Sequence, residues 1–120
     1  MKKLFVIFLL LNIIFTISYG KELWEKLKKN IFINYKTIVV DDNSVSGWFK
    51  IIEPQQQAYK LEKYKAYCAQ KVIEVQHTKI FDNNSNLLEE TINNSKVGCN
   101  YNGIINGKLY YKTLCKKKKF

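Results

Sequence analysis

Apolar and polar residues alternate along much of the chain after residue 30, and this alternation predicts β-strands. The clearest case is residues 71–81, whose apolar side would carry Ile73, Val75, His77 and Phe81. The polar side of the same strand would carry Glu74, Gln76 and Thr78. A period of two with one wet face is typical of antiparallel sheets, so the pattern predicts that architecture.

Four more segments are rich in β-branched and aromatic residues, which favour strands. They are residues 31–40, 46–53, 59–69 and 87–92. Clusters of Asp, Asn and Ser at 41–44 and 82–86 predict turns, because these side chains hydrogen-bond to their own backbone. Pro54 and the glutamines after it predict a loop, and residues 93–103 are predicted as a polar loop.

The two ends of the predicted domain follow a different pattern. Leu23, Trp24 and Leu27 share a stripe at helical spacing, which predicts a short helix or turn over residues 21–30. Residues 104–119 fit two alternatives. As a helix they would bring Tyr110, Tyr111, Leu114 and Cys115 to one face, with Asn106 as the N-cap. As a strand they would align Leu109, Tyr111, Thr113 and Cys115.

The first twenty residues have the pattern of a cleavable secretory signal. Lys2 and Lys3 precede an apolar run over residues 4–17, and small residues stand at Ser18 and Gly20. The run is shorter than the ~20 residues of a spanning helix, which favours cleavage over a membrane anchor. We therefore expect a signal peptide at 1–20 and a single exported domain at 21–120.

The chain is strongly basic, with a formal net charge of +10 and no arginine. Without Lys2 and Lys3 it keeps 18 lysines against 10 acidic residues, a balance of +8. Arginine is the usual reader of guanine and phosphate, so we expect no nucleic-acid partner. Affinity for anionic surfaces or glycans, or solubility alone, accounts for the charge. The run Lys116, Lys117, Lys118 and Lys119 is the candidate contact with an anionic surface.

Catalytic groups are sparse, which indicates a non-enzymatic protein without a cofactor or bound metal. His77 is the only histidine, and no cysteine pair has the spacing of a zinc or redox motif. Asp82, Asn84 and Asn86 begin like a calcium loop, but the following glycine and the twelfth-position glutamate are missing. Several tyrosines lie beside lysines, a composition common at protein or glycan contact surfaces. A small hydrolase that uses His77 is a weak hypothesis, which a His77→Ala variant would test.

Three cysteines remain in the exported domain, so one disulfide and one leftover thiol are expected in an oxidising compartment. Counting alone leaves all three pairings open. The chain contains, in this order, the motifs FINYKTI, GWFKII, YKAYC, TKIFDNN and LYYKTLC. In these motifs, and in the order of its strands and cysteines, it resembles the surface-adhesin protein E family of small exported bacterial proteins, over about Trp24 to Cys115.

The resemblance implies an α+β fold, with a small antiparallel sheet and a C-terminal helix packed on one face. It also implies a disulfide between Cys68 in the sheet and Cys115 in the helix, which closes a loop worth about 4 kcal/mol of chain entropy. Cys99 has no counterpart in the family and is the candidate free thiol. If Cys99 is exposed, it would allow a disulfide-linked homodimer. The Pro-Gly-Ser that precedes the family's last helix is replaced by residues 105–107, Ile-Asn-Gly.

The family name implies adhesion to host extracellular-matrix glycoproteins. We therefore expect an exported adhesin, in the periplasm or on the surface of a Gram-negative bacterium. The alternative hypothesis is a periplasmic accessory or envelope protein that has no host ligand. A fold does not transfer a function by itself, so the two hypotheses must be separated by the binding surface and by localisation.

Overall fold

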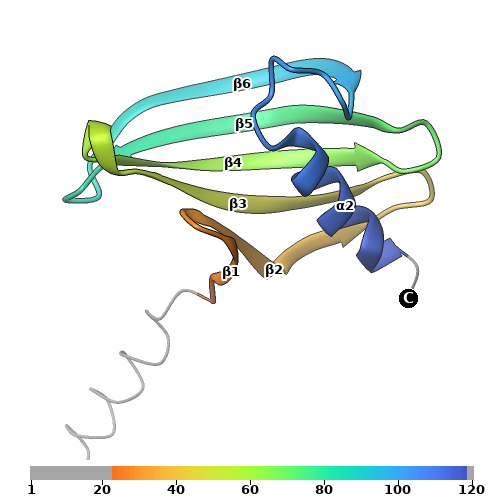
Figure 1. Cartoon of the computed structure of the whole chain (residues 1–120), viewed down its shortest axis with the longest axis horizontal. Helices are drawn as coiled ribbons and strands as arrows, with labels where there is room; N and C mark the ends of the chain where they lie inside the picture. Colours follow the sequence, from red (N-terminus) through yellow and green to blue (C-terminus); the bar gives the residue numbers. More distant parts are fainter. Residues whose placement is uncertain (1–22, 119–120) are drawn as a thin grey trace, which may run out of the picture.

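Residues 23–118 form a six-stranded antiparallel sheet crossed on one face by a single C-terminal helix, as the computed structural model describes them (Figure 1). The strands follow one another in space in sequence order, and each connection is a hairpin. Their bounds are β1 Glu25–Lys28, β2 Ile31–Val40, β3 Val45–Glu53, β4 Ala58–Tyr67, β5 Val72–Asp82 and β6 Leu87–Gly98. A 3-10 turn, η1 Pro54–Gln56, joins β3 to β4, and the helix is α2 Gly107–Lys118. The predicted α+β fold is confirmed, whereas the predicted signal segment lies outside the described residues.

The C-terminal segment is helical, which decides between the two alternatives that the sequence allowed. Tyr110 and Leu114 are four residues apart, so they share one face of α2 and are buried against the sheet. Asn106 stands just before the helix, and its carbonyl accepts a 3.1 Å hydrogen bond from the Tyr110 N–H. Its side-chain oxygen accepts from Lys28 Nζ at 2.9 Å, which ties the start of the helix to β1.

The hydrophobic core lies between α2 and the centre of the sheet. Ile33, Val45, Phe49 and Leu114 are completely inaccessible to solvent, and Tyr110 is 2% exposed. The Tyr110 ring stacks on Tyr64 at 4.4 Å between centroids and leans on Phe49 at 4.6 Å. Because the helix supplies two of these core residues, the sheet loses its dry side if the helix leaves.

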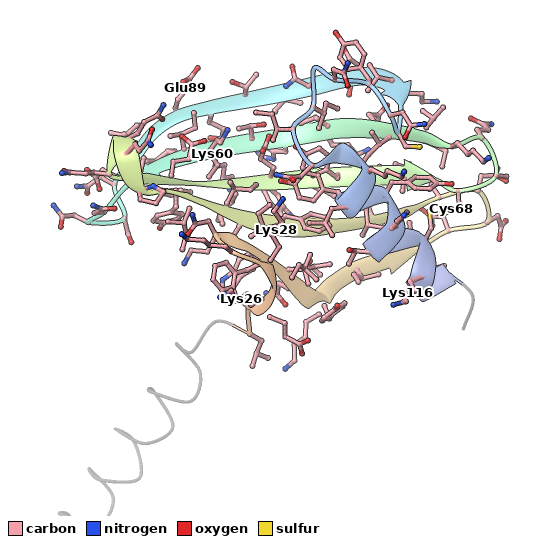
Figure 2. The ribbon with its side chains drawn as sticks, in the orientation of Figure 1. Lys26, Lys28, Lys60, Cys68, Glu89 and Lys116 are labelled. Atoms are coloured by element: carbon pink, nitrogen blue, oxygen red, sulfur yellow. A yellow bond between two sulfur atoms is a disulfide. The ribbon has the colours of Figure 1, made fainter. Side chains whose placement is uncertain are left out.

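A disulfide joins Cys68, just after β4, to Cys115 in α2, as the resemblance implied. Figure 2 shows Cys68 beside the C-terminal half of the helix, close to Lys116. The Tyr111 hydroxyl donates a 2.6 Å hydrogen bond to the Cys68 carbonyl, so a second interaction holds the same two segments together. Cys99 is unpaired and 8% exposed, so its thiol is not accessible for a disulfide with a second copy of the folded chain.

The predicted N-terminal helix is wrong, because residues 25–28 form the edge strand β1. Lys26 pairs with Phe32 and Lys28 with Ile31 across a β-bulge. A helix within residues 21–30 would be too short to be stable by itself in water, whereas pairing with β2 supplies hydrogen-bond partners for the backbone of residues 25–28. Leu27 packs against the core from this strand.

The predicted loop over residues 93–103 is also wrong in its first half. The strand β6 continues to Gly98, and Ser95, Lys96 and Val97 pair with β5. An edge strand has one neighbour and faces water widely, so polar residues are tolerated along it. Residues 93–97 carried no hydrophobic alternation for this reason, and the strand was not detectable from periodicity.

A β-bulge at Gln76 overturns the predicted face of His77 and Phe81. Tyr64 pairs with Val75 and the preceding Lys63 pairs with His77, so Gln76 has no partner of its own on β4. An extra residue in one strand moves all later side chains to the opposite face. Ile73 and Val75 therefore face the helix as predicted, whereas His77 and Phe81 face away from it.

Gly47 lies where the helix comes closest to the sheet. A Cβ atom at this position would be 3.1 Å from Leu114 Cδ2 and 3.2 Å from Ile38 Cγ1. We expect Gly47→Val to lower the free energy of unfolding by about 1–3 kcal/mol through overpacking. Gly98→Val is the matched control, because a Cβ there has no atom within 4 Å. Urea unfolding of both variants measures the effect, and equal stabilities would contradict close packing at Gly47.

Because two tyrosines are buried in the core, we expect the protein to lose stability in alkaline solution. Burial, reinforced by the nearby Glu62 carboxylate, raises the pKa of Tyr64 and of Tyr110 above the usual value. A raised folded-state pKa gives a stabilising contribution that is fully present below the unfolded pKa of about 10 and is lost as the pH rises. We expect the free energy of unfolding to fall above about pH 10, and to fall less steeply in Tyr64→Phe. Urea unfolding across this range measures it. The same slope in Tyr64→Phe as in Tyr101→Phe, whose side chain is 57% exposed, would contradict the prediction.

Candidate functional site

The two faces of the sheet carry opposite charges, although the sequence shows only a general excess of lysine. Cross-strand partners point to the same face, so the register assigns each paired side chain of β3 to β6 to one face. The face under α2 carries four carboxylates and one lysine, namely Glu53, Glu62, Asp82, Glu89 and Lys60. The opposite face carries five lysines and two carboxylates, namely Lys50, Lys63, Lys65, Lys79, Lys96, Glu74 and Glu90.

Aromatic side chains are interleaved with these five lysines on the face away from the helix. On β3 to β5 they are Trp48, Tyr59, Tyr67 and Phe81. We refer to these four rings and the five lysines together as the lysine–aromatic face. Among the described residues 23–118, no other element covers it, since α2 packs on the other side of the sheet (Figure 1). Most of its side chains are half-buried, and Lys96 is exposed.

The rings of this face hold the lysine ammonium groups in place. Lys50 Nζ lies 4.8 Å from the Tyr59 ring centre, and Lys79 Nζ lies 5.7 Å from that of Trp48. Such cation–π contacts are worth about 0.5–1 kcal/mol at exposed sites. The Tyr59 ring also stacks on Phe81 at 5.1 Å, which fixes its orientation. These contacts therefore restrict the positions of the Lys50 and Lys79 ammonium groups.

Two lysine ammonium groups lie over the Tyr67 ring, at the end of the face next to the β2–β3 hairpin. Lys96 Nζ lies 4.3 Å from the Tyr67 ring centre and Lys65 Nζ lies 5.6 Å from it. Glu74 pairs with both lysines across the strands and is 6% exposed. Its carboxylate also accepts a 2.9 Å hydrogen bond from Gln76. This carboxylate is thus enclosed by its neighbours and adds little negative charge to the surface that a ligand would meet.

His77 belongs to the same face, where its ring contacts Glu90 and Trp48. Its Nε2 atom lies 2.6 Å from Glu90 Oε1, and its ring centre lies 5.3 Å from that of Trp48. The cavity of about 340 Å³ beneath the start of α2, lined in part by Tyr64 and Tyr110, is on the other side of the sheet. His77 therefore has no part in that enclosed space, and the hydrolase hypothesis gains no support from it.

The C-terminal lysines predicted to contact an anionic surface lie on the helix side. Lys116 is exposed, and it lines a hollow of about 850 Å³ next to the disulfide, together with Leu109, Tyr111 and Lys112. Lys117 and Lys118 complete α2, but their side chains are not described, and Lys119 lies outside the described residues. Lys116 therefore lies on the opposite side of the sheet from the lysine–aromatic face.

The calcium-like stretch at residues 82–86 is a turn in which the Asp82 carboxylate is hydrogen-bonded by groups of the turn itself. The Asp82 carboxylate accepts hydrogen bonds from the N–H groups of Asn84 and Asn86, each at 2.9 Å, and from the Asn86 amide at 3.1 Å. These hydrogen bonds, led by those from Asn86, lower the pKa of Asp82. Across residues 23–118, no group of three or more His, Cys, Asp or Glu side chains is arranged to hold a metal ion. Within the same range, no helix has the length and apolar content to cross a bilayer.

Comparisons with protein-family models, curated proteins and solved structures gave no match to this chain. The site must therefore be argued from its own geometry.

Sequence reasoning missed the lysine–aromatic face, although part of its signal was present. Residues 59–67, YKLEKYKAY, place Tyr59, Lys63, Lys65 and Tyr67 at odd positions. Alternation therefore puts them on one face of β4. The matching positions on β5 could not be aligned without knowing of the bulge at Gln76. Charge separation between the two faces depends on that alignment.

Proposed function

We propose that the exported chain is a non-enzymatic adhesin of the protein E type, which binds host extracellular-matrix glycoproteins through the lysine–aromatic face. The observation that carries the proposal is an uncovered sheet face on which five lysines stand among four aromatic rings. Positive charge steers anionic partners toward the surface, and amphipathic rings supply contact area at low entropic cost. The secretory pattern of residues 1–20 supports a location where such ligands are met.

Solid-phase binding of the exported protein to immobilised matrix glycoproteins tests this proposal. Binding is expected at low salt and should weaken as the ionic strength rises, because exposed charges are screened beyond a Debye length of about 8 Å at 0.15 M. No binding at low salt would remove the adhesin function while leaving the fold unaffected.

Localisation separates the adhesin from the alternative, a periplasmic accessory or envelope protein. We expect the protein to be accessible to protease added to intact cells. Complete protection in intact cells, with digestion only after the outer membrane is opened, would exclude adhesion at the cell surface. It would leave the periplasmic role as the better explanation of an exported basic domain.

A further inference from the structure

We infer that the group recognised by the lysine–aromatic face is a linear sulfated polysaccharide chain of the matrix glycoproteins. This inference rests on the proposed function and narrows its ligand. The five lysines lie on four neighbouring strands, β3 to β6, and form one continuous field. On the helix side, the strands β3 to β6 carry more carboxylates than lysines, and the exposed lysines Lys108, Lys112 and Lys116 belong to α2 itself.

The spacing of the lysines suits a polymer with closely repeated anions. Neighbouring strands are about 4.8 Å apart, and residues two apart along a strand are separated by about 6.8 Å. Lys63 and Lys65 are two apart on β4, and Lys50 and Lys79 lie in one cross-strand row on either side of Leu61. A chain laid across the strands would therefore meet an ammonium group at every second strand, as at Lys50 and Lys79. An isolated anion would use only one or two of these lysines.

The rings of the face already have partners, which argues against nucleic acid as the polyanion. Single-stranded nucleic acids bind by stacking bases on open aromatic faces. Here Lys50 lies over Tyr59, Lys79 over Trp48, and two lysines over Tyr67. A base would have to displace an ammonium group before it could stack. A sulfated sugar chain needs only contacts with the ammonium groups and no open ring face.

The amount of lysine also argues against a protein surface as the ligand. Lysine is depleted at the centres of protein–protein interfaces, whereas here it occupies the centre of the face. Insertion into a bilayer requires apolar side chains among the basic ones, and the exposed residues Leu87 and Ile92 do point to this face from its β6 edge. A bilayer is therefore compared directly with the polysaccharide in the vesicle experiment below.

The experiment compares two triple variants with the same change in net charge. One is Lys50→Gln, Lys63→Gln and Lys79→Gln, with one substitution on each of β3, β4 and β5. The control is Lys108→Gln, Lys112→Gln and Lys116→Gln, three exposed lysines of α2. We expect the first to bind heparin about tenfold more weakly than the parent protein, at about 0.5 kcal/mol for each lost charge contact. The control should stay within about twofold. Circular dichroism establishes that both variants are folded, and equal weakening in the two would overturn the inference.

A second measurement separates this inference from the proposed function on which it rests. The protein is tested on an immobilised heparan sulfate proteoglycan before and after enzymatic removal of the sulfated chains. Loss of binding after removal supports the inference. Undiminished binding to the stripped glycoprotein, without binding to heparin, would refute the sulfated ligand and leave the adhesin proposal standing. No binding to either form of the glycoprotein or to heparin would refute both.

Two further probes decide between sources of negative charge. Oligo-dT and vesicles of phosphatidylglycerol with phosphatidylcholine are compared with heparin at the same salt concentration. We expect both to bind more weakly than heparin, and chemically desulfated heparin to bind more weakly than the native polymer. Tighter binding of either probe than of heparin, or equal binding of desulfated heparin, would overturn the assignment of a sulfated polysaccharide.

Discussion

Replacing both Cys68 and Cys115 with alanine is expected to lower the free energy of unfolding by about 4 kcal/mol. The bridge spans 47 residues of sequence, and without it the unfolded chain recovers the entropy of that large loop. A domain of this size has a total stability of about 5–15 kcal/mol, so the loss is a large share. Urea unfolding followed by far-UV circular dichroism measures the change. The alanine variant should also become insensitive to reductant, whereas the parent protein should be destabilised by it.

The matched control for this prediction is Cys99→Ala, which removes a buried cysteine that has no disulfide. It should cost about 1 kcal/mol or less, because only one side-chain heavy atom, the sulfur, is lost and no covalent link is broken. A stability of the double variant close to that of Cys99→Ala would show that the bridge does not restrict the unfolded chain as expected. The Tyr111 hydrogen bond to Cys68 would then be the stronger attachment of the helix.

The central strands were predictable because burial imposed a period of two on their residues. Ile73 and Val75 alternate with polar neighbours; Ile73 is buried, and Val75 is partly buried against the same core. The disulfide pairing was different, since three cysteines allow three pairings and only the family resemblance selected Cys68 with Cys115. That part of the architecture was inferred by analogy, and it is confirmed by the bond itself.

The wrong predictions for β1, β6 and the face of His77 have one physical cause, which is the pairing between strands. The short β1 and the polar half of β6 lie at the two edges of the sheet, where hydrogen bonds to one neighbour replace the need for a hydrophobic pattern. The bulge at Gln76 changed the face of His77, although it left no mark in the alternation. Local sequence reports burial well, but it does not report which residue of a neighbouring strand stands opposite.

The same limit explains why the candidate site moved from the C-terminus to the sheet. Four consecutive lysines at 116–119 are conspicuous in the sequence, whereas the lysines of the lysine–aromatic face are dispersed from Lys50 to Lys96. Folding as an antiparallel meander brings the dispersed group together and sends most carboxylates of β3 to β6 to the other face. A charge count along the chain cannot show this separation.

Stability and the proposed binding activity are therefore on opposite sides of one sheet. The helix, the core and the disulfide occupy one side, and the lysine–aromatic face occupies the other. Substitutions at sites without shared contacts have nearly additive effects. Loss of a lysine such as Lys63 should thus affect binding without loosening the helix, and variants in the helix interface should affect stability first.

The second large effect is expected for Tyr110→Ala, which removes the largest fully buried side chain of the core. Its ring lies 4.4 Å from that of Tyr64 and 4.6 Å from that of Phe49. Truncation of a buried aromatic residue typically costs 3–5 kcal/mol, about as much as losing the disulfide. We expect a loss of about this size in urea unfolding, together with weaker near-ultraviolet circular dichroism from the disrupted ring cluster.

Two control variants separate the effect of ring packing from the effects of the hydroxyl group and of an exposed ring. Tyr110→Phe keeps the ring and removes the hydroxyl, so it should retain most of the stability if ring packing dominates. Tyr101→Ala removes an exposed ring and should change the free energy of unfolding by about 0.5 kcal/mol or less. A loss in Tyr110→Phe as large as in Tyr110→Ala would show that the hydroxyl holds the helix. A small loss in Tyr110→Ala would show that the disulfide alone keeps α2 on the sheet.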